Sequence, residues 1–266
     1  MAGKASSSLA ARDAPSELAL ITTWARRERR VRYRQTWLAT YWALLYPAAT
    51  LVMYGWFFSV VLHVRGDGLP YLAFAFAGIV PWTFLAGAAI SASSSILQAV
   101  RTISSMSFRR EVIPLGAMTS NMTELAIGAA VLAALAVVQG IGLSVTVVAL
   151  LLVATVLLLW VGALCLLLAT TTVFLRDVGH GGPLLLQLGF ILTPVMYPTS
   201  LLPERFDWLS TINPMAVIVE ATRDVVLRHV WPSWWLLAIH ALAGAGALAL
   251  SLAYCRSVEV RFAEVA

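Results

Sequence analysis

The sequence predicts an all-α integral membrane protein with six transmembrane helices and both termini on the cytoplasmic side. Of its 266 residues, 60% are hydrophobic and 12% are charged, whereas a soluble domain carries roughly 25% charged residues. Several stretches lack charge for long enough, at ~1.5 Å per helical residue, to cross a ~30 Å hydrocarbon core. Basic residues favour one side, with fourteen on the segments assigned to the inside and four on those assigned to the outside. This bias is the positive-inside pattern of membrane proteins.

The N-terminal region is expected to contain a disordered leader at 1–16, a cytoplasmic amphipathic basic helix at 17–35 and the first span at 36–63. No apolar signal-peptide core precedes the basic helix. That helix carries six arginines within nine residues, which are Arg26, Arg27, Arg29, Arg30, Arg32 and Arg34. Basic residues beside a span fix its orientation, and they can also hold anionic headgroups at ~1 kcal/mol per charge. Their position explains the sequence pI of about 9.6 better than nucleic-acid binding does.

The remaining charge-poor stretches supply five more spans and a cytoplasmic tail. A break in the second span is expected near Pro81, because proline removes a helical donor. The turn Gln139–Ser144 separates the third span from the fourth, and the fifth is rich in glycine and proline. The five spans are placed at about 69–98, 119–139, 145–173, 179–199 and 233–255, and the tail at 257–266.

A segment at about 103–114 is too polar to span and is predicted to lie on the inner side. Its sequence, RTISSMSFRREVIPLG from Arg101 to Gly116, is basic and contains helix-compatible stretches. We expect a short surface helix that ends at Pro114.

A second polar segment, at 200–232, is predicted to lie on the outer side. Asn213 followed by Pro214 predicts a helix N-cap and first turn. The spacings Glu220–Arg223 and Asp224–Arg228 predict ion pairs within that helix. The segment is too charged to cross the membrane and too apolar to be a free loop. We expect a broken pair of helices that dips into the outer leaflet, because backbone at membrane depth must be buried in protein or face water.

The chain lacks the residues of several kinds of active site. Lys4 is the only lysine, which excludes a phosphate-binding loop with its lysine, so the chain is not expected to be an enzyme. Two cysteines and four histidines lack zinc-like spacing, and neither a catalytic nor a metal site is expected. Glu124 and His240 are too few to form the proton relay of an ion-coupled transporter.

Four motifs carry a resemblance to a known family. In chain order they read RRVRYRQTWLATYWALLYP, GIVPWTF, FRREVIPL and FLRDVGHGGPLLLQLGFILTPVMYPTSLLPERFDWLSTINP. Together they resemble the permease subunit of polysaccharide and polyol-phosphate exporters, a group of type-2 ABC exporters that includes O-antigen, teichoic acid and capsule exporters. The resemblance runs from about Arg26 to Arg256. One departure is Ala39, at a position within the first motif where a glycine often follows the RYRQT-x-L block.

The resemblance implies a six-span ABC-2 transmembrane domain over 36–256, in the inner membrane of a bacterium. It implies a homodimer that pairs with two copies of a separate ABC ATPase, which carries the ATP and magnesium, so that no cofactor is expected on this chain. It also implies a channel through which a polyprenyl-pyrophosphate-linked polysaccharide passes outward. The missing lysine independently requires an energy source on another chain.

The resemblance also implies roles for particular residues. A coupling helix at about 103–114 and the loop after the fourth span are expected to contact the ATPase, through Ser104, Phe108, Arg109, Arg110, Glu111, Arg176 and Asp177. The outer re-entrant helices and gate are expected to include Pro194, Tyr197, Pro198, Glu204, Asn213 and Pro214.

Several alternatives stay open at this point. The arginines of 26–34 either anchor the topology or also capture the lipid pyrophosphate, for which a guanidinium fork is suited. The aromatic residues Tyr54, Trp56, Phe57 and Phe58 form an interfacial belt or line the glycan channel. Arg176 and Asp177 form a local ion pair or contact the ATPase. A drug or lipid exporter of the same superfamily, a membrane-embedded transferase and an ion-coupled transporter remain as alternative functions.

Overall fold

The computed structural model describes residues 21–26, 45, 49, 52, 53, 56, 57, 66–100 and 109–258. Throughout these ranges the regular structure is helical, apart from an isolated bridge between Gly66 and Leu69. The all-α prediction is therefore confirmed. The predicted leader, most of the first span, residues 103–108 of the predicted coupling helix and the end of the tail lie outside the described residues.

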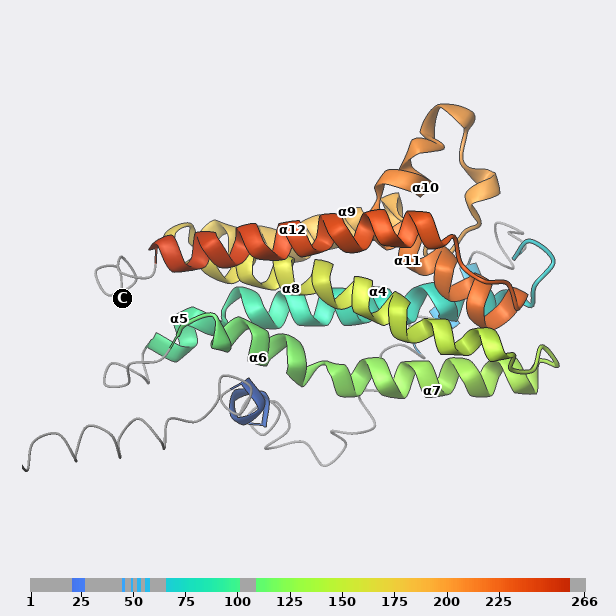
Figure 1. Ribbon diagram of the computed structural model, residues 1–266, viewed down its shortest axis with the longest axis horizontal. Helices are drawn as coiled ribbons and strands as arrows, with labels where there is room; N and C mark the ends of the chain where they lie inside the picture. The colour runs from blue at the N-terminus through green and yellow to red at the C-terminus, as the bar shows by residue number, and fades with distance from the viewer. Residues whose placement is uncertain are drawn as a thin grey trace, which may run out of the picture.

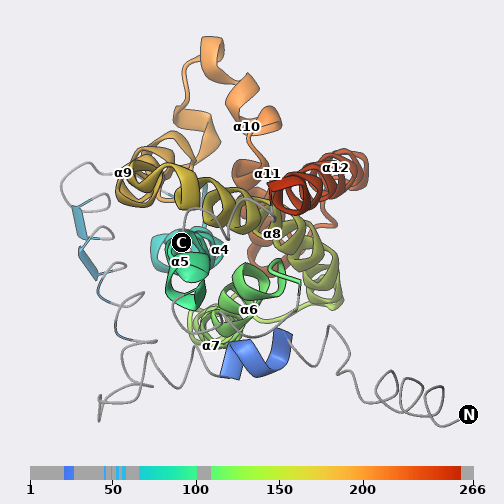
Figure 2. The ribbon, with the colours of Figure 1, turned by 90° about the vertical axis from the view of Figure 1, so that its left-hand side faces the viewer.

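Five helices run along the long axis of the molecule (Figure 1). They are α4 (Tyr71–Ser93), α7 (Met122–Val138), α8 (Leu150–Phe174), α9 (Arg176–Leu192) and α12 (Trp234–Val258). Viewed along that axis, α4 and α8 lie between α9 and α12 on one side and α6 and α7 on the other (Figure 2).

Short helices gather at the two ends of this bundle (Figure 1). One end, called the α6 end below, holds α5 (Ser95–Val100), the start of α6 (Val112–Ser120) and the last turn of α12. The opposite end, called the α11 end, holds α10, α11 and four single-turn elements. Their bounds are Trp208–Ile212 for α10, Pro214–Arg223 for α11, Val145–Ala149 for η2, Thr199–Leu201 for η3, Glu204–Phe206 for η4 and Asp224–Arg228 for η5.

Four described stretches are long and apolar enough to cross a membrane, so the chain is a multi-pass membrane protein. They are Tyr71–Ser93, Val112–Val138, Val145–Phe174 and Trp234–Val258, and they match the predicted second, third, fourth and sixth spans. The predicted fifth span corresponds to α9, whose 17 residues extend ~26 Å, slightly less than a ~30 Å hydrocarbon core. The count of six spans and their orientation stay predictions.

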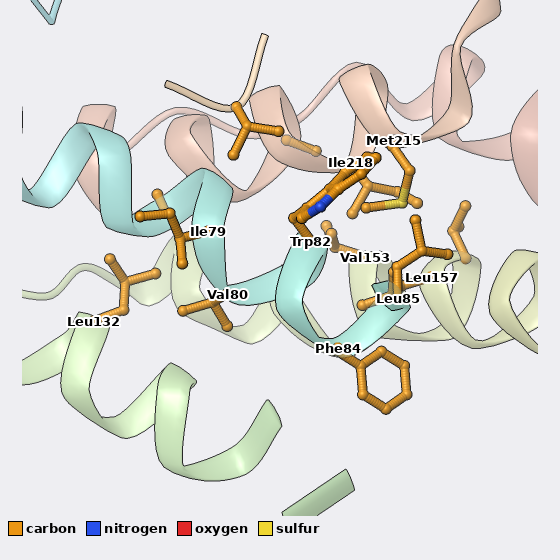
Figure 3. Close-up of a cluster of buried hydrophobic side chains, with 14 of the residues drawn as sticks. Ile79, Val80, Trp82, Phe84, Leu85, Leu132, Val153, Leu157, Met215 and Ile218 are labelled. Carbon is orange, nitrogen blue, oxygen red and sulfur yellow. The ribbon is translucent and has the colours of Figure 1, made fainter. Parts of the chain in front are cut away.

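Helix α4 forms the centre of the core (Figure 3). Its side chains Ile79, Val80, Trp82, Phe84 and Leu85 are all buried. Around them pack Leu132 of α7, Val153 and Leu157 of α8, and Met215 and Ile218 of α11. Alanines and glycines alternate with these large residues along α4, and small residues allow the close helix approach on which packing in a membrane depends.

Two prolines behave differently from the sequence prediction. Helix α4 continues through Pro81, and the break lies at Ser94 instead, so the break predicted near Pro81 is wrong. A buried transmembrane helix tolerates proline when its surroundings satisfy the backbone. The end predicted at Pro114 is also wrong, because Pro114 lies in the first turn of α6, where the missing N–H has no helical acceptor to lose.

The turn between the third and fourth spans is confirmed. Helix α7 ends at Val138, and residues 139–144 connect it to η2. Gly140 and Gly142 adopt φ of 77° and 80°, a left-handed backbone that glycine accepts without steric cost. The amides of Gly140 and Ile141 donate to the carbonyls of Val137 and Ala136, which satisfies the end of the helix.

Gly78 allows the turn after α9 to lie against α4. A Cβ atom at position 78 would overlap the carbonyl oxygen of Val195, and no flexible side chain there could yield. The absence of a side chain at Gly78 is therefore what brings these two segments into contact.

We expect Gly78→Ala to lower the free energy of unfolding by about 1–3 kcal/mol, the usual cost of overpacking. The measurement is the Tm of the purified protein in detergent. Gly246→Ala in α12 is the matched control, because nothing lies within 4 Å of a Cβ there and alanine favours the helix. Equal Tm values for the two variants would contradict the tight contact at Gly78.

Candidate functional site

Asn213 connects the break between α10 and α11 to the turn after α9. Its side-chain oxygen accepts a hydrogen bond from the Met215 amide at 2.9 Å, and Pro214 is the first residue of α11. The predicted N-cap is therefore confirmed. The Asn213 amide group also donates to the Thr193 hydroxyl at 2.9 Å, so this cap fixes the position of a second chain segment.

Arg223 is the most deeply buried charged residue among those described, with 0% of its surface exposed. Its Nη1 pairs with Glu220 at 2.6 Å, as the sequence spacing predicts. Its Nη2 donates to the Val195 carbonyl at 2.6 Å and its Nε to the Phe74 carbonyl at 3.3 Å. The guanidinium carbon lies 3.7 Å from the centroid of the Phe74 ring. One side chain of α11 thus holds α4 and the turn after α9 together.

Arg228 closes the same charge network from η5. It contacts Glu220 at 2.8 Å and Asp224 at 2.7 Å, which confirms the predicted pair with Asp224. Burial alone would lower the pKa of Arg228, but its hydrogen bonds with Glu220 and Asp224 outweigh this and raise the pKa. Burial lowers the pKa of Arg223, and the neighbouring Glu220 carboxylate opposes that shift.

The predicted gate residues follow α9 directly. Pro194 and Pro198 are buried, and the Tyr197 hydroxyl donates to the Ile191 carbonyl at 2.9 Å. The Tyr71 hydroxyl of α4 donates to the Met196 carbonyl at 2.8 Å. Glu204 lies apart from this cluster on the exposed part of 199–212, which projects from the bundle (Figures 1 and 2).

At the α6 end, Glu111 lies just before α6 and is only 5% exposed. Arg256 in the last turn of α12 binds its carboxylate, with Nη2 at 2.6 Å from Oε1 and Nε at 3.2 Å from both oxygens. Arg109 lies 3.9 Å from the same carboxylate. Of the predicted coupling residues, Arg109, Arg110 and Glu111 therefore lie together, whereas Ser104 and Phe108 are outside the described residues.

Arg176 and Asp177 begin α9 at this same end of the bundle, separated from α8 only by Leu175. Both are exposed, and in the part of the chain that the structure describes no salt bridge joins their side chains. Two side chains that face solvent without pairing each other are available to a partner. This geometry favours the second of the two interpretations that the sequence leaves open for them.

Of the predicted headgroup site, only Arg26 is described, and it is exposed at the end of a helical turn over 21–26. That turn lies across the bundle axis, seen end-on in Figure 1. It packs on α6, where a Cβ at Gly116 would lie 2.8 Å from the Cβ of Trp24. The other five arginines lie outside the described residues. Of the predicted aromatic lining, Trp56 and Phe57 are 60% and 43% exposed, and Tyr54 and Phe58 are not described.

The buried charges of the described residues connect helix ends rather than assemble reactive groups. No group of three His, Cys, Asp or Glu side chains in the described ranges is placed to hold a metal ion. Arg223 joins segments at the α11 end, and Arg256 does the same at the α6 end. The sequence-based predictions include neither of these long-range contacts. The one signal for them is the isolated charge of Arg223 among Val217, Ile218 and Val226, which indicates a buried arginine in need of partners.

Comparison with known proteins agrees with this architecture. A profile described as "ABC-2 type transporter" matches residues 19–227. The chain belongs to the ABC-2 type transporter family. This confirms the resemblance to type-2 ABC exporter permeases. The O-antigen export system permease protein RfbA of Klebsiella pneumoniae is similar to this ABC-2 chain, with 25% identity over 92% of this chain and 94% of the relative. A protein of the same name from Myxococcus xanthus is 26% identical over 80% of this chain and 82% of its own length.

We expect Arg223→Met to destabilise the ABC-2 chain by roughly 3–5 kcal/mol, because the change leaves the buried Val195 carbonyl without its donor and removes one partner of a buried ion pair. Arg223→Lys is expected to recover only part of this, since one ammonium cannot reproduce the planar fork. Thermal unfolding in detergent measures both.

Arg205→Met is the control for this experiment, because Arg205 lies on the exposed part of the same region, with its guanidinium carbon 4.9 Å from the centroid of the Phe206 ring. Its Tm is expected to match that of the wild type. If Arg223→Met also unfolded at the wild-type temperature, the network around Arg223 would not hold the α11 end together.

Proposed function

We propose that this chain is the channel-forming permease subunit of an ATP-driven exporter of polyprenyl-pyrophosphate-linked polysaccharide. The observation that carries the proposal is the match to O-antigen export permeases over nearly the full length of both chains. The same match favours a glycan over the drug or lipid substrates of other ABC-2 exporters.

In this proposal the α6 end faces the cytoplasm and the α11 end faces outward. The positive-inside bias supports the orientation, because Arg109, Arg110, Arg176 and Arg256 all lie at the α6 end. The membrane spans then number six, with the first span at 36–63 and α9 as the fifth. The segment 200–232 forms the re-entrant helices and gate at the outer surface of a bacterial inner membrane.

Energy enters at the α6 end from a separate ATPase, two copies of which bind a homodimer of this chain. The absence of any lysine beyond Lys4 supports this division, since a phosphate-binding loop requires one. The segment around 103–114 and the exposed pair Arg176 and Asp177 provide the contact surface. ATP and magnesium are held by the partner.

The substrate is proposed to enter with its pyrophosphate against the arginines of 26–34. Guanidinium groups bind phosphate oxygens in pairs, and the described turn 21–26 lies across the bundle axis, as a helix at a membrane surface does. The sugar chain then passes along a largely uncharged path beside the first and fifth spans. Tyr54, Trp56, Phe57 and Phe58 offer flat rings that can contact sugar faces.

The purified chain alone is expected to hydrolyse no ATP, and hydrolysis is expected to appear when its ATPase partner is added. The measurement is phosphate release from reconstituted membranes. The control is a partner ATPase whose phosphate-binding lysine is replaced. The complex with this partner should release no phosphate. Turnover by the permease alone, free of contaminating ATPase, would contradict the proposed division of roles.

Replacing Arg30, Arg32 and Arg34 together with Gln should weaken the apparent affinity for the lipid-linked glycan. At ~1 kcal/mol per charge the loss is on the order of 100-fold. Substrate-stimulated ATP hydrolysis measures it, while basal hydrolysis and assembly are expected to persist. Arg261→Gln in the tail is the control for a general loss of positive charge. A variant that only inverts or destabilises the topology would identify the arginines as an anchor and refute headgroup capture.

A further inference from the structure

Helix α12 is joined to the segment before α6 by a directional ion pair. Arg256 and Glu111 are 145 residues apart in sequence, and the guanidinium reaches both oxygens of the nearly buried carboxylate. Each charge also lies at the helix end of opposite partial charge, Glu111 at the N-terminus of α6 and Arg256 in the last turn of α12. The pair therefore holds these two helix ends in one relative position.

The same helix is joined to α10 near its other end. The His240 side chain is 5% exposed, and its Nε2 lies 2.9 Å from the Thr211 carbonyl oxygen. A carbonyl oxygen only accepts, so Nε2 carries the proton and donates it. The backbone carbonyl of His240 accepts from the Trp160 indole at 3.0 Å. His240 therefore fixes α12 against both α8 and the projecting region that contains α10.

Between these two contacts α12 is an uninterrupted helix. Arg256 lies sixteen positions after His240, a distance of ~24 Å at helical rise. Gly244 and Gly162 let α12 and α8 pack closely, because a Cβ at Gly244 would lie 3.0 Å from the Trp160 indole nitrogen and one at Gly162 3.3 Å from a methyl group of Leu248. A displacement applied at Arg256 is thus carried along a stiff body to Thr211.

We propose that α12 transmits movement of the coupling segment to the region around α10, with Arg256 and His240 as positioning residues for transport. The inference rests on the proposed function, in which the ATPase acts at the α6 end and export is completed at the α11 end. When the ATPase displaces residues 109–111, Glu111 moves Arg256, and the α12–α8 pair carries the displacement to α10. Apolar contacts alone would let the helices slide, since lipid is as apolar as their side chains.

We expect the protein to stay folded without the ion pair, because a separate apolar cluster holds the last turns of α12 in place. Cys255 packs there with Ile96 of α5 and with Ala169 and Val173 of α8. Arg256 can therefore be changed without losing the position of the helix. The apolar cluster around Cys255 and the ion pair of Arg256 are thus separate contacts, and the ion pair can be tested by itself.

The test uses the full complex with its ATPase, reconstituted in membranes, and reports movement at the α11 end. Ile212, which is 66% exposed, is changed to Cys, and the two buried cysteines Cys165 and Cys255 are kept, with the protein that lacks Ile212→Cys reporting background labelling. The rate at which an impermeant maleimide labels this thiol is compared with and without ATP, beside basal hydrolysis and glycan export. In the parent complex we expect ATP to change the labelling rate at least threefold.

Arg256→Glu is expected to abolish the ATP-dependent difference and to reduce export at least tenfold, with basal hydrolysis within twofold of the parent. The swap Glu111→Arg with Arg256→Glu restores the opposite charges and should recover at least half of the difference. His240→Leu should also abolish the difference, and His240→Gln, which keeps a donor, should recover part of it. Ser257→Glu, an exposed neighbour of Arg256, is the matched control and should behave as the parent.

Arg256→Glu with an unchanged ATP-dependent difference, or a swap that assembles without recovery, would overturn the inference. If Arg256→Glu alone fails to assemble, the swap decides in the same way, and a swap that also fails to assemble counts against the inference. The two proposals fail in different ways. A parent complex in which ATP changes the labelling rate but which exports no glycan would refute the proposed substrate. The labelling of the variants would still decide the inference about α12.

Discussion

The buried guanidinium of Arg223 is the interaction on which the α11 end depends. A charge removed from water is costly unless every donor finds an acceptor. Each of the three nitrogens of Arg223 has an acceptor, either Glu220 or one of two backbone carbonyls on separate segments, and the guanidinium carbon lies 3.7 Å from the centroid of the Phe74 ring. A guanidinium presents its donors in a fixed planar arrangement, so satisfying them also fixes the positions of those segments. The requirement for complete pairing is therefore what gives this end of the molecule a single arrangement.

The Val195 carbonyl shows how this constraint reaches the core. It accepts from Arg223 and lies against the bare backbone of Gly78. The turn after α9 can meet both only because position 78 has no side chain. One helical turn further along α4, Trp82 packs against Phe190 with ring centroids 5.6 Å apart and against Gly189. One glycine and one arginine thus together place the turn after α9 against α4.

The sequence predicts those features that depend on neighbouring residues. Charge-free length predicts the helices of the bundle, glycine predicts the turn at 139–144, and Asn213 with Pro214 predicts the start of α11. The sequence does not predict contacts between segments that are distant along the chain. Arg223 is predicted to lie in an outer helix, and spacing reveals only its partner Glu220. Nothing in the local pattern pairs Glu111 with Arg256 or His240 with Thr211, because such pairs arise only when helices distant in sequence pack together.

The break predicted at Pro81 is wrong for a related reason. At Pro81 the prediction assumes that a lost donor breaks a helix, which holds when water competes for the backbone. Inside a bundle water does not compete for the backbone, and α4 therefore continues as a helix through Pro81. Within such a uniformly apolar bundle, helix faces can slide with little change in energy. The buried polar contacts described above resist such sliding, and those of Arg223 and Arg256 lie at its two ends.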